Sequence, residues 1–319
     1  MAVEGASTPM DRLAPDVAAV VGEMAIGTID ETLVHAIRSF ELPGSEPPEG
    51  VRRREHLIGG ETGVRVRVHR PDPAPDGPVP CVVSMHGGGY VIGSSTMDDA
   101  FFDELTPALG IVGVAVDYRL APETPYPGGL EDCYRALAWT QEHAAELGVD
   151  PGRIGVRGAS AGGGLAAALA LLAKERGEVD VAFQLLDCPM LDDRQVTASS
   201  QIDGLPMWSR ESNTFGWRSY LGDGYGTGDV PATAAPARAT DAELAGLPPA
   251  FVSVGAIDGF LDEDVEYARR LIHAGVATEL HVYPGACHGY QLAEHSEVAR
   301  QSRRDVHDWL ARQIRPAAG

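Results

Sequence analysis

A serine lies between two glycines where a short apolar stretch meets one rich in alanine and leucine. The residues Gly158-Ala159-Ser160-Ala161-Gly162 follow a predicted strand over 153–157 and precede a predicted helix over 161–177. In a tight turn between strand and helix, side chains two residues away from the serine would clash, and glycines remove that clash. The dipole of the helix also favours negative charge at the serine. This context favours a nucleophilic Ser160 over an ordinary glycine-rich turn.

A run of glycines lies earlier in the chain, directly after another predicted strand. The residues are His86-Gly87-Gly88-Gly89. A glycine-rich loop after a strand can bind phosphate, but no lysine follows here and the GxGxxG spacing is absent. Bare backbone N–H groups can instead stabilise the oxyanion that forms when a serine attacks a carbonyl group. The serine downstream makes an oxyanion hole the favoured interpretation.

A serine nucleophile needs a base and an acidic residue that orients the base. In hydrolases with this turn, the acid and then the histidine follow the serine in the chain, each just after a strand. Asp258 and His288 both occupy such positions. Asp262 and Asp264 are rival acids, although carboxylates are also common in the first turn of a helix for capping reasons. The other candidate histidines, expected to be structural or at the surface, are His281, His295 and His307.

The elements that must position these residues alternate between strands and helices. The strands are short, rich in valine and mostly apolar on both faces, as a parallel sheet between helices requires. They are predicted over 79–85, 111–117, 153–157, 182–187, 250–256 and 279–283. Helices are predicted over 99–109, 128–147, 161–177, 262–274 and 292–313. This alternation predicts an α/β fold.

Two regions do not follow the alternation. Residues 9–40 carry helical periodicity, and 64–68 alternate like a half-exposed strand that could pair with 51–58. About sixty residues, 188–249, separate two of the buried strands and contain a predicted aromatic-rich helix over 210–221. An insertion after the carboxyl end of a strand lies over the ligand-binding edge of the sheet. We therefore expect it to act as a lid over the site.

The composition excludes several classes of partner. The 319 residues include 46 acidic and 25 basic ones, which gives a formal net charge of −21. Such a charge repels phosphate backbones and anionic lipids, so we expect neither nucleic-acid binding nor a membrane anchor. The four cysteines are scattered without metal-ligand spacing, so neither a zinc site nor a disulfide framework is indicated. Residues 1–13 lack the pattern of a signal peptide, and we expect a cytoplasmic protein.

Several motifs in order resemble those of the hormone-sensitive lipase family of α/β-hydrolases, the bacterial type IV carboxylesterases. They are His86-Gly87-Gly88-Gly89, residues 117–123 (DYRLAPE), Asp150-Pro151 with Arg153-Ile154, the Ser160 turn with Gly163, residues 235–238 (APAR), residues 246–249 (GLPP), Asp258 with Leu261-Asp262, and His288-Gly289-Tyr290. The resemblance covers the chain beyond about residue 50. It implies an α/β-hydrolase fold with an eight-stranded, mostly parallel sheet flanked by helices and a helical cap. Ala159 departs from the family, which usually has Asp or Thr there, and this leaves the subgroup open.

The resemblance also assigns roles to residues. It makes Ser160 the nucleophile, His288 the general base and Asp258 the residue that orients the histidine. It assigns the oxyanion hole to the backbone N–H groups of Gly88, Gly89 and Ala161. It implies a cap formed by 1–45 and 190–235 over a catalytic core of 46–189 and 236–319.

Further residues are expected near the substrate or around the glycine loop. The expected pocket walls are Tyr90, Trp208 and Phe215, with Phe101, Met207 and Trp217 as additional candidates. Arg119 and Glu123 are expected to brace the His86 loop within a buried polar network. The edge of the strand over 279–283 is a candidate homodimer contact.

The predicted reaction is the hydrolysis of short- to medium-chain carboxylic esters through an acyl-enzyme, without a metal or an organic cofactor. The same triad would also serve an amidase, or a hydrolase that removes the acyl group of a specialised metabolite. Some relatives of this family have lost the catalytic histidine and bind small ligands. A non-catalytic binder on this fold is therefore the alternative from a different class.

Overall fold

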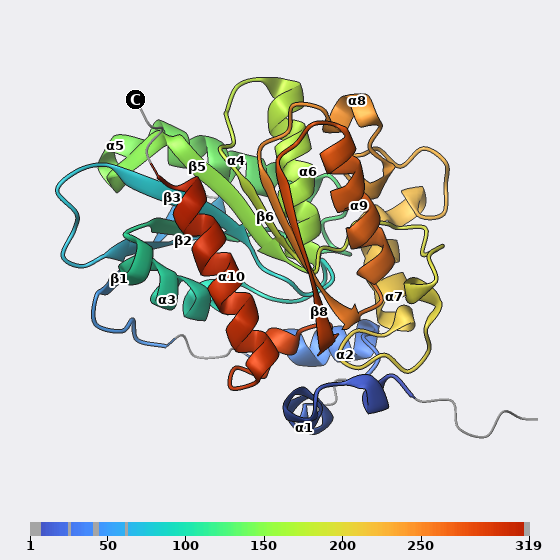
Figure 1. The fold of residues 1–319 in the computed structure, drawn as a ribbon. Helices are drawn as coiled ribbons and strands as arrows, with labels where there is room; N and C mark the ends of the chain where they lie inside the picture. Colours follow the sequence, from blue (N-terminus) through green and yellow to red (C-terminus); the bar gives the residue numbers. More distant parts are fainter. Residues whose placement is uncertain (1–7, 25–26, 41–44, 61–62, 316–319) are drawn as a thin grey trace, which may run out of the picture.

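The computed structural model describes residues 8–24, 27–40, 45–60 and 63–315, which form one eight-stranded sheet between layers of helices (Figure 1). The strands are β1 (Val51–Ile58), β2 (Val64–Pro71), β3 (Val79–Met85), β4 (Val112–Asp117), β5 (Val149–Ala159), β6 (Gln184–Asp187), β7 (Ala250–Ile257) and β8 (Thr278–Cys287). Their spatial order is β1-β2-β4-β3-β5-β6-β7-β8. The β1–β2 and β2–β4 pairs are antiparallel, and the other neighbouring pairs are parallel. The predicted eight-stranded, mostly parallel sheet is confirmed.

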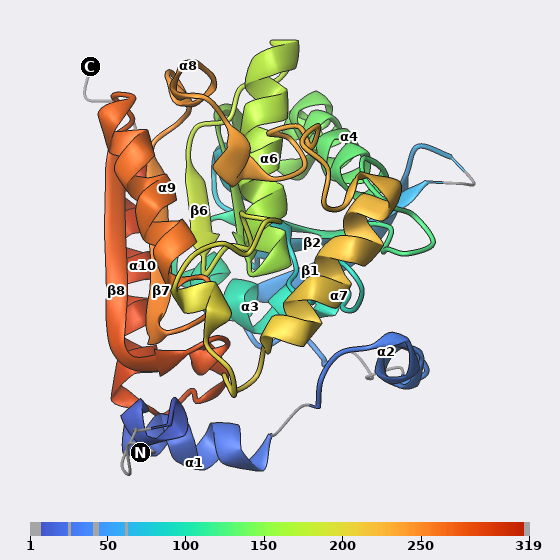
Figure 2. The same cartoon turned by 90° about the vertical axis from the view of Figure 1, so that its right-hand side faces the viewer.

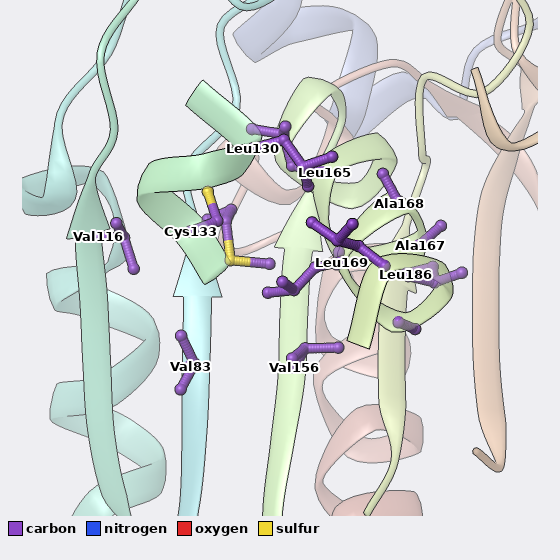
Figure 3. Packing of buried hydrophobic residues seen from close by; sticks show 14 of the residues in the cluster. Val83, Val116, Leu130, Cys133, Val156, Leu165, Ala167, Ala168, Leu169 and Leu186 are labelled. Atoms are coloured by element: carbon purple, nitrogen blue, oxygen red, sulfur yellow. The ribbon is translucent and has the colours of Figure 1, made fainter. Parts of the chain in front are cut away.

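Consecutive residues of the central strands pack on opposite faces of the sheet. In β3, Val83 belongs to the main hydrophobic core, whereas Val82 belongs to a second core on the other face. Since side chains alternate along a strand, a strand covered on both faces must be apolar at nearly every position. Figure 3 shows Val116, Val83 and Val156 on neighbouring strands, with Leu169 on the helix that covers them. This two-sided burial explains the short, valine-rich runs in the sequence.

The helices form a layer on each face of the sheet (Figures 1 and 2). One layer contains α4 (Gly128–Glu142), α6 (Ala161–Arg176) and α9 (Leu261–His273), and the other contains α3 (Asp99–Leu109) and α10 (Glu297–Gln313). Two further helices, α5 (Ala144–Leu147) and α8 (Asp241–Leu244), are only four residues long. None of the helices in the described ranges combines the length and apolar character that a membrane span requires.

Two of the predicted helices are wrong in detail. The predicted helix over 292–313 begins only at Glu297, because the Ser296 hydroxyl accepts a hydrogen bond from the Ala299 N–H and so caps the helix there. The predicted helix over 128–147 is interrupted at His143, between the end of α4 at Glu142 and the start of α5 at Ala144. Both errors lie at helix boundaries, where apolar periodicity alone carries little information.

Three further helices lie at the carboxyl edge of the parallel strands (Figures 1 and 2). They are α1 (Pro15–Glu23), α2 (Glu31–Arg38) and α7 (Arg210–Leu221). Val17 and Val21 of α1 pack against Tyr290 just after β8, and Trp217 and Tyr220 of α7 join the main core. The aromatic helix predicted over 210–221 therefore lies at this edge of the sheet.

A test of the core packing uses Gly155 of β5. A Cβ atom at Gly155 would lie 2.1 Å from Cε2 of the buried Phe183 ring. Since a packed ring cannot move far, we expect Gly155→Ala to lower the free energy of unfolding by about 1–3 kcal/mol in urea titrations. Gly22→Ala is the matched control, because nothing lies within 4 Å of its added Cβ. Equal stability of the two variants would contradict this packing.

Candidate active site

Ser160 occupies a strained turn between β5 and α6. Its backbone has φ 57° and ψ −122°, a conformation that side chains rarely adopt. A Cβ at Gly158 would lie 2.0 Å from the carbonyl oxygen of Gly162, and one at Gly162 would lie 1.9 Å from that of Met85. The two glycines therefore allow the turn to close and let the helix approach β3.

Three side chains form a continuous chain of hydrogen bonds at this turn. His288 Nε2 lies 2.9 Å from Ser160 Oγ, and His288 Nδ1 lies 2.8 Å from Asp258 Oδ2. Because a carboxylate only accepts hydrogen bonds, Nδ1 carries the proton and Nε2 is free to accept one from the serine. The other carboxylate oxygen of Asp258 accepts a hydrogen bond from the Phe260 N–H at 3.0 Å. All three side chains are largely buried.

The surroundings of His288 favour its protonated form. Burial alone lowers the pKa of His288, but the charge and hydrogen bond of Asp258, with a further contribution from Asp187, outweigh burial and raise this pKa above its usual value. A raised pKa makes the neutral imidazole a stronger base, which accepts a proton more readily. The arrangement suits a general base that takes the serine proton.

The glycine loop after β3 passes beside the serine. A Cβ at Gly87 would lie 3.4 Å from Ser160 Cβ. Gly88 and Gly89 have φ of 114° and 60°. A Cβ added at Gly88 would lie 2.1 Å from the Ile92 carbonyl oxygen, and one added at Gly89 would lie 2.2 Å from the Trp208 ring. These two positions therefore require glycine. The loop therefore lies close to the nucleophile.

The bracing of this loop differs from the expectation. The His86 ring stacks on Tyr118 at a centroid distance of 4.2 Å, and the Tyr118 hydroxyl donates to the His86 carbonyl at 2.8 Å. Arg119 instead pairs with the buried Asp132, and the exposed Glu123 pairs with Arg38. The predicted buried network of Arg119 and Glu123 around the His86 loop is therefore wrong. An aromatic ring stack fills this role.

Arg38 links an N-terminal helix to the same region. It lies at the end of α2, and its Nε donates to the Val91 carbonyl at 2.8 Å. Its Nη2 donates to the Ala121 carbonyl at 2.6 Å, while Nη1 binds the Glu123 carboxylate. One arginine thus attaches α2 both to the segment after the glycine loop and to the segment after β4.

The expected pocket residues lie in different surroundings. Trp208 lies against the catalytic groups, with its ring 6.3 Å from that of His288 and directly over Gly89. Tyr90 is buried, stacks on Tyr220 at 4.0 Å and donates its hydroxyl to the Met190 carbonyl. The remaining candidates are placed as follows: Phe215 packs half-buried on the main core, Trp217 is fully buried, Met207 lies near Gly289, and Phe101 packs under Arg157 on the α3 face.

Sequence reasoning missed two residues at the end of β6. The Asp187 carboxylate is buried, and its charge contributes to the raised pKa of His288. Cys188 follows it, with Sγ, an Asp258 oxygen and a His288 nitrogen all within 4.8 Å of one another. Such a set could bind a soft metal ion, but both His288 nitrogens already have partners in Ser160 and Asp258. An acidic residue at the end of a buried strand was the signal that could have identified Asp187.

Neither rival acid is paired with the histidine, whose Nδ1 and Nε2 contact Asp258 and Ser160. The Asp262 carboxylate accepts a hydrogen bond from the Ser199 N–H at 2.7 Å. Asp264 is fully buried, and neither of its oxygens has a hydrogen-bond partner within the described part of the chain. Burial first, and then the charges of Glu263 and Asp258, raise the pKa of Asp264 well above its usual value. Burial without a partner therefore favours the protonated form of Asp264.

This protonation predicts how stability responds to pH. When the pKa of a carboxyl group is higher in the folded than in the unfolded protein, the free energy of unfolding falls as the pH rises above the unfolded-state pKa, which is 3.8 for Asp. Asparagine does not titrate, so we expect the stability of Asp264→Asn relative to wild type to increase with pH. The gain should approach about 1.4 kcal/mol per pH unit as the pH rises from 3.8 toward the folded-state pKa of Asp264, measured by urea unfolding.

The exposed Asp203→Asn is the control, and its stability relative to wild type should not depend on pH. A difference between Asp264→Asn and wild type that stays constant with pH would mean that the Asp264 carboxyl group is ionised in the folded protein.

Comparisons with known proteins agree with this geometry. Residues 82–292 match the model of a family described as having the alpha/beta hydrolase fold. The carboxylesterase NlhH of Mycobacterium tuberculosis is 38% identical over 260 residues, which cover 80% of each chain.

Two solved structures are also similar. A bacterial heroin esterase superposes with a TM-score of 0.87 and 39% identity, over 97% of this chain and 100% of that one. The esterase LipW from Mycobacterium marinum gives a TM-score of 0.82 and 35% identity, over 96% and 98% of the two chains. The chain therefore belongs to the α/β-hydrolase fold family, as a member of its hormone-sensitive lipase branch.

Proposed function

We propose that this protein is a serine carboxylesterase that hydrolyses short- to medium-chain carboxylic esters through an acyl-enzyme. The observation that carries the proposal is the unbroken chain of hydrogen bonds from Asp258 through His288 to Ser160. The similar proteins named as a carboxylesterase and as esterases support the same activity. Neither a metal nor an organic cofactor is needed for this chemistry.

The first half of the reaction forms an ester on Ser160. His288 Nε2 takes the proton from Oγ as Oγ bonds to the carbonyl carbon of the substrate. The carbonyl oxygen becomes an oxyanion, which accepts hydrogen bonds from the backbone N–H groups of Gly88, Gly89 and Ala161. The C–O bond to the alcohol then breaks, and the alcohol leaves with the proton from His288.

The second half releases the acid. Water gives a proton to His288 as its oxygen attacks the acyl carbon, and the new oxyanion occupies the same hole. The bond to Oγ breaks, Ser160 recovers its proton and the carboxylic acid departs. Asp258 keeps Nδ1 protonated throughout, so that Nε2 can accept and return protons.

The proposal also assigns a cap, a catalytic core and an acyl pocket around the site. We assign the cap to residues 1–45 and 190–235, parts of which lie outside the described ranges, and the core to 46–189 and 236–319. Trp208, Tyr90 and Phe215 would shape the acyl pocket, with Trp208 supported by its position over Gly89. A cytoplasmic location and a homodimer through the edge at β8 remain predictions.

Loss of the nucleophile tests the proposed mechanism. We expect Ser160→Ala to lower the hydrolysis rate of p-nitrophenyl acetate by roughly 10⁴–10⁶-fold, because no acyl-enzyme can form. Its circular dichroism and thermal unfolding should match those of the wild type. The exposed Ser45→Ala should keep full activity. Retained activity in Ser160→Ala would overturn the mechanism, and a wild type inert to a fluorophosphonate probe would favour a non-catalytic binder.

The length of the acyl chain tests the substrate range. The Trp208 ring lies directly over Gly89. If this ring limits the acyl pocket, kcat/KM should peak at acyl chains of about two to six carbons. A series of p-nitrophenyl esters from acetate to palmitate measures this. Trp208→Ala should shift the optimum toward longer chains. A wild-type preference for long, emulsified esters would contradict the expected range.

A further inference from the structure

Asp187 lies at the centre of the strand ends that carry the triad. It is the last residue of β6, which pairs with β5 on one side and β7 on the other. Ser160 follows the end of β5, and Asp258 follows the end of β7. The side chain is almost fully buried, although the reaction proposed above gives it no role. A buried carboxylate in such a place needs a physical reason.

Three hydrogen bonds join Asp187 to the segments that bear the triad. Its carbonyl oxygen accepts from the Ser160 N–H at 2.8 Å. Its Oδ1 accepts from the Ser253 hydroxyl of β7 at 2.7 Å. Its Oδ2 accepts from Gln291 Nε2, three residues after His288, also at 2.7 Å. One residue thus contacts the nucleophile, the strand that leads to Asp258 and the loop that follows His288.

The backbone after Asp187 is held in an unusual conformation. Cys188 has a φ of 39°, which residues other than glycine rarely adopt. Its N–H donates to the Ser253 carbonyl at 2.6 Å, so β7 holds this turn in place. Strain of this kind persists only where surrounding contacts enforce it, and it is concentrated at functional sites.

The charges around Asp187 come from several elements. Burial raises its pKa, whereas the hydrogen bonds of Ser253 and Gln291 and the charges of Arg157 and His288 act against this rise. The other titratable groups that face this region are Asp258, Asp264, Cys188, Tyr283 and Tyr290. Asp187 also lines a cavity of about 460 Å³ between α3 and α10. The other titratable groups that line this cavity are Glu104, Arg157, Glu294, His295 and Arg303. The charge of Asp187 therefore lies between this cavity and His288.

We propose that Asp187 is a positioning residue of the catalytic centre, which ties the Ser160 turn to the His288 loop and adds a second negative charge beside the histidine. This inference rests on the proposed function. It adds a residue that the triad does not include and that touches neither substrate nor reacting atoms.

The decisive variant is Asp187→Asn, which removes the charge and keeps the shape. The amide oxygen can accept from Gln291 while the amide nitrogen donates to the Ser253 hydroxyl, so both hydrogen bonds survive. Loss of the negative charge makes His288 easier to deprotonate. We expect the acid limb of the kcat/KM profile, which reports the neutral histidine, to move about half a pH unit or more toward lower pH. KM near the pH optimum should stay within about twofold of the wild type.

Two matched variants keep the carboxyl group and remove one hydrogen bond each. Ser253→Ala and Gln291→Leu should lower kcat by about three- to tenfold through looser positioning, with a smaller displacement of the acid limb than in Asp187→Asn. A purely structural role for Asp187 would lower the thermal stability of all three variants and leave the pH profile of each unchanged. That result would overturn the proposal.

A titration that needs no turnover separates this inference from the proposed function. The imidazole signals of His288 in the resting protein report its pKa by NMR, with His288→Gln used for assignment. We expect a lower His288 pKa in Asp187→Asn than in wild type, and an equal value would overturn the inference even in an active esterase. If wild type hydrolyses no ester but the pKa shift is present, the proposed function fails and the electrostatic link between Asp187 and His288 stands.

Discussion

The positive φ of Ser160 is a constraint on which several distant parts of the structure depend. A side chain in this conformation persists only if neighbouring groups hold it, and here its N–H bonds to the Asp187 carbonyl of the next strand. The turn also brings α6 so close to β3 that Gly162 almost touches the Met85 carbonyl. That close approach places the glycine loop, which directly follows Met85, beside the nucleophile. The same strained turn thus positions the serine and the glycine loop beside it.

Buried charge gathers at this edge of the sheet, and each carboxyl group is stabilised in its own way. Asp98 pairs with Arg157, and Asp258 contacts His288 and a backbone amide. Asp187 accepts two side-chain hydrogen bonds, whereas Asp264 has no hydrogen-bond partner among the described residues and its burial favours the protonated form. Because an unpaired buried charge is costly, only groups with partners can stay ionised. The hydrogen bonds therefore stabilise negative charge beside His288, whereas burial without a partner favours the protonated form of Asp264.

Much of the fold was predictable because its strands are buried on both faces. β3 has the predicted bounds, and so does the helix Arg210–Leu221, whose Ser209 cap lies just before it. The start of α10 was not predictable from periodicity, because the Ser296 cap decides it. The triad was predictable from order and context, since carboxyl ends of parallel strands meet at one edge. The stack of His86 on Tyr118 was not, because it depends on how two loops approach each other.

The sequence by itself determined the kind of chemistry. The glycines around Ser160, the glycine loop and the order of serine, acid and histidine each follow from local steric and chemical demands. The sequence favoured Asp258 over the nearby Asp262 and Asp264 as the acid, and the tertiary structure brings Asp258 into hydrogen-bonding distance of His288. Only the tertiary structure decided that Arg38 binds the segment after the glycine loop and that Asp187 joins three strand ends. These contacts join residues far apart in sequence, and side-chain direction and burial, which local patterns do not carry, determine them.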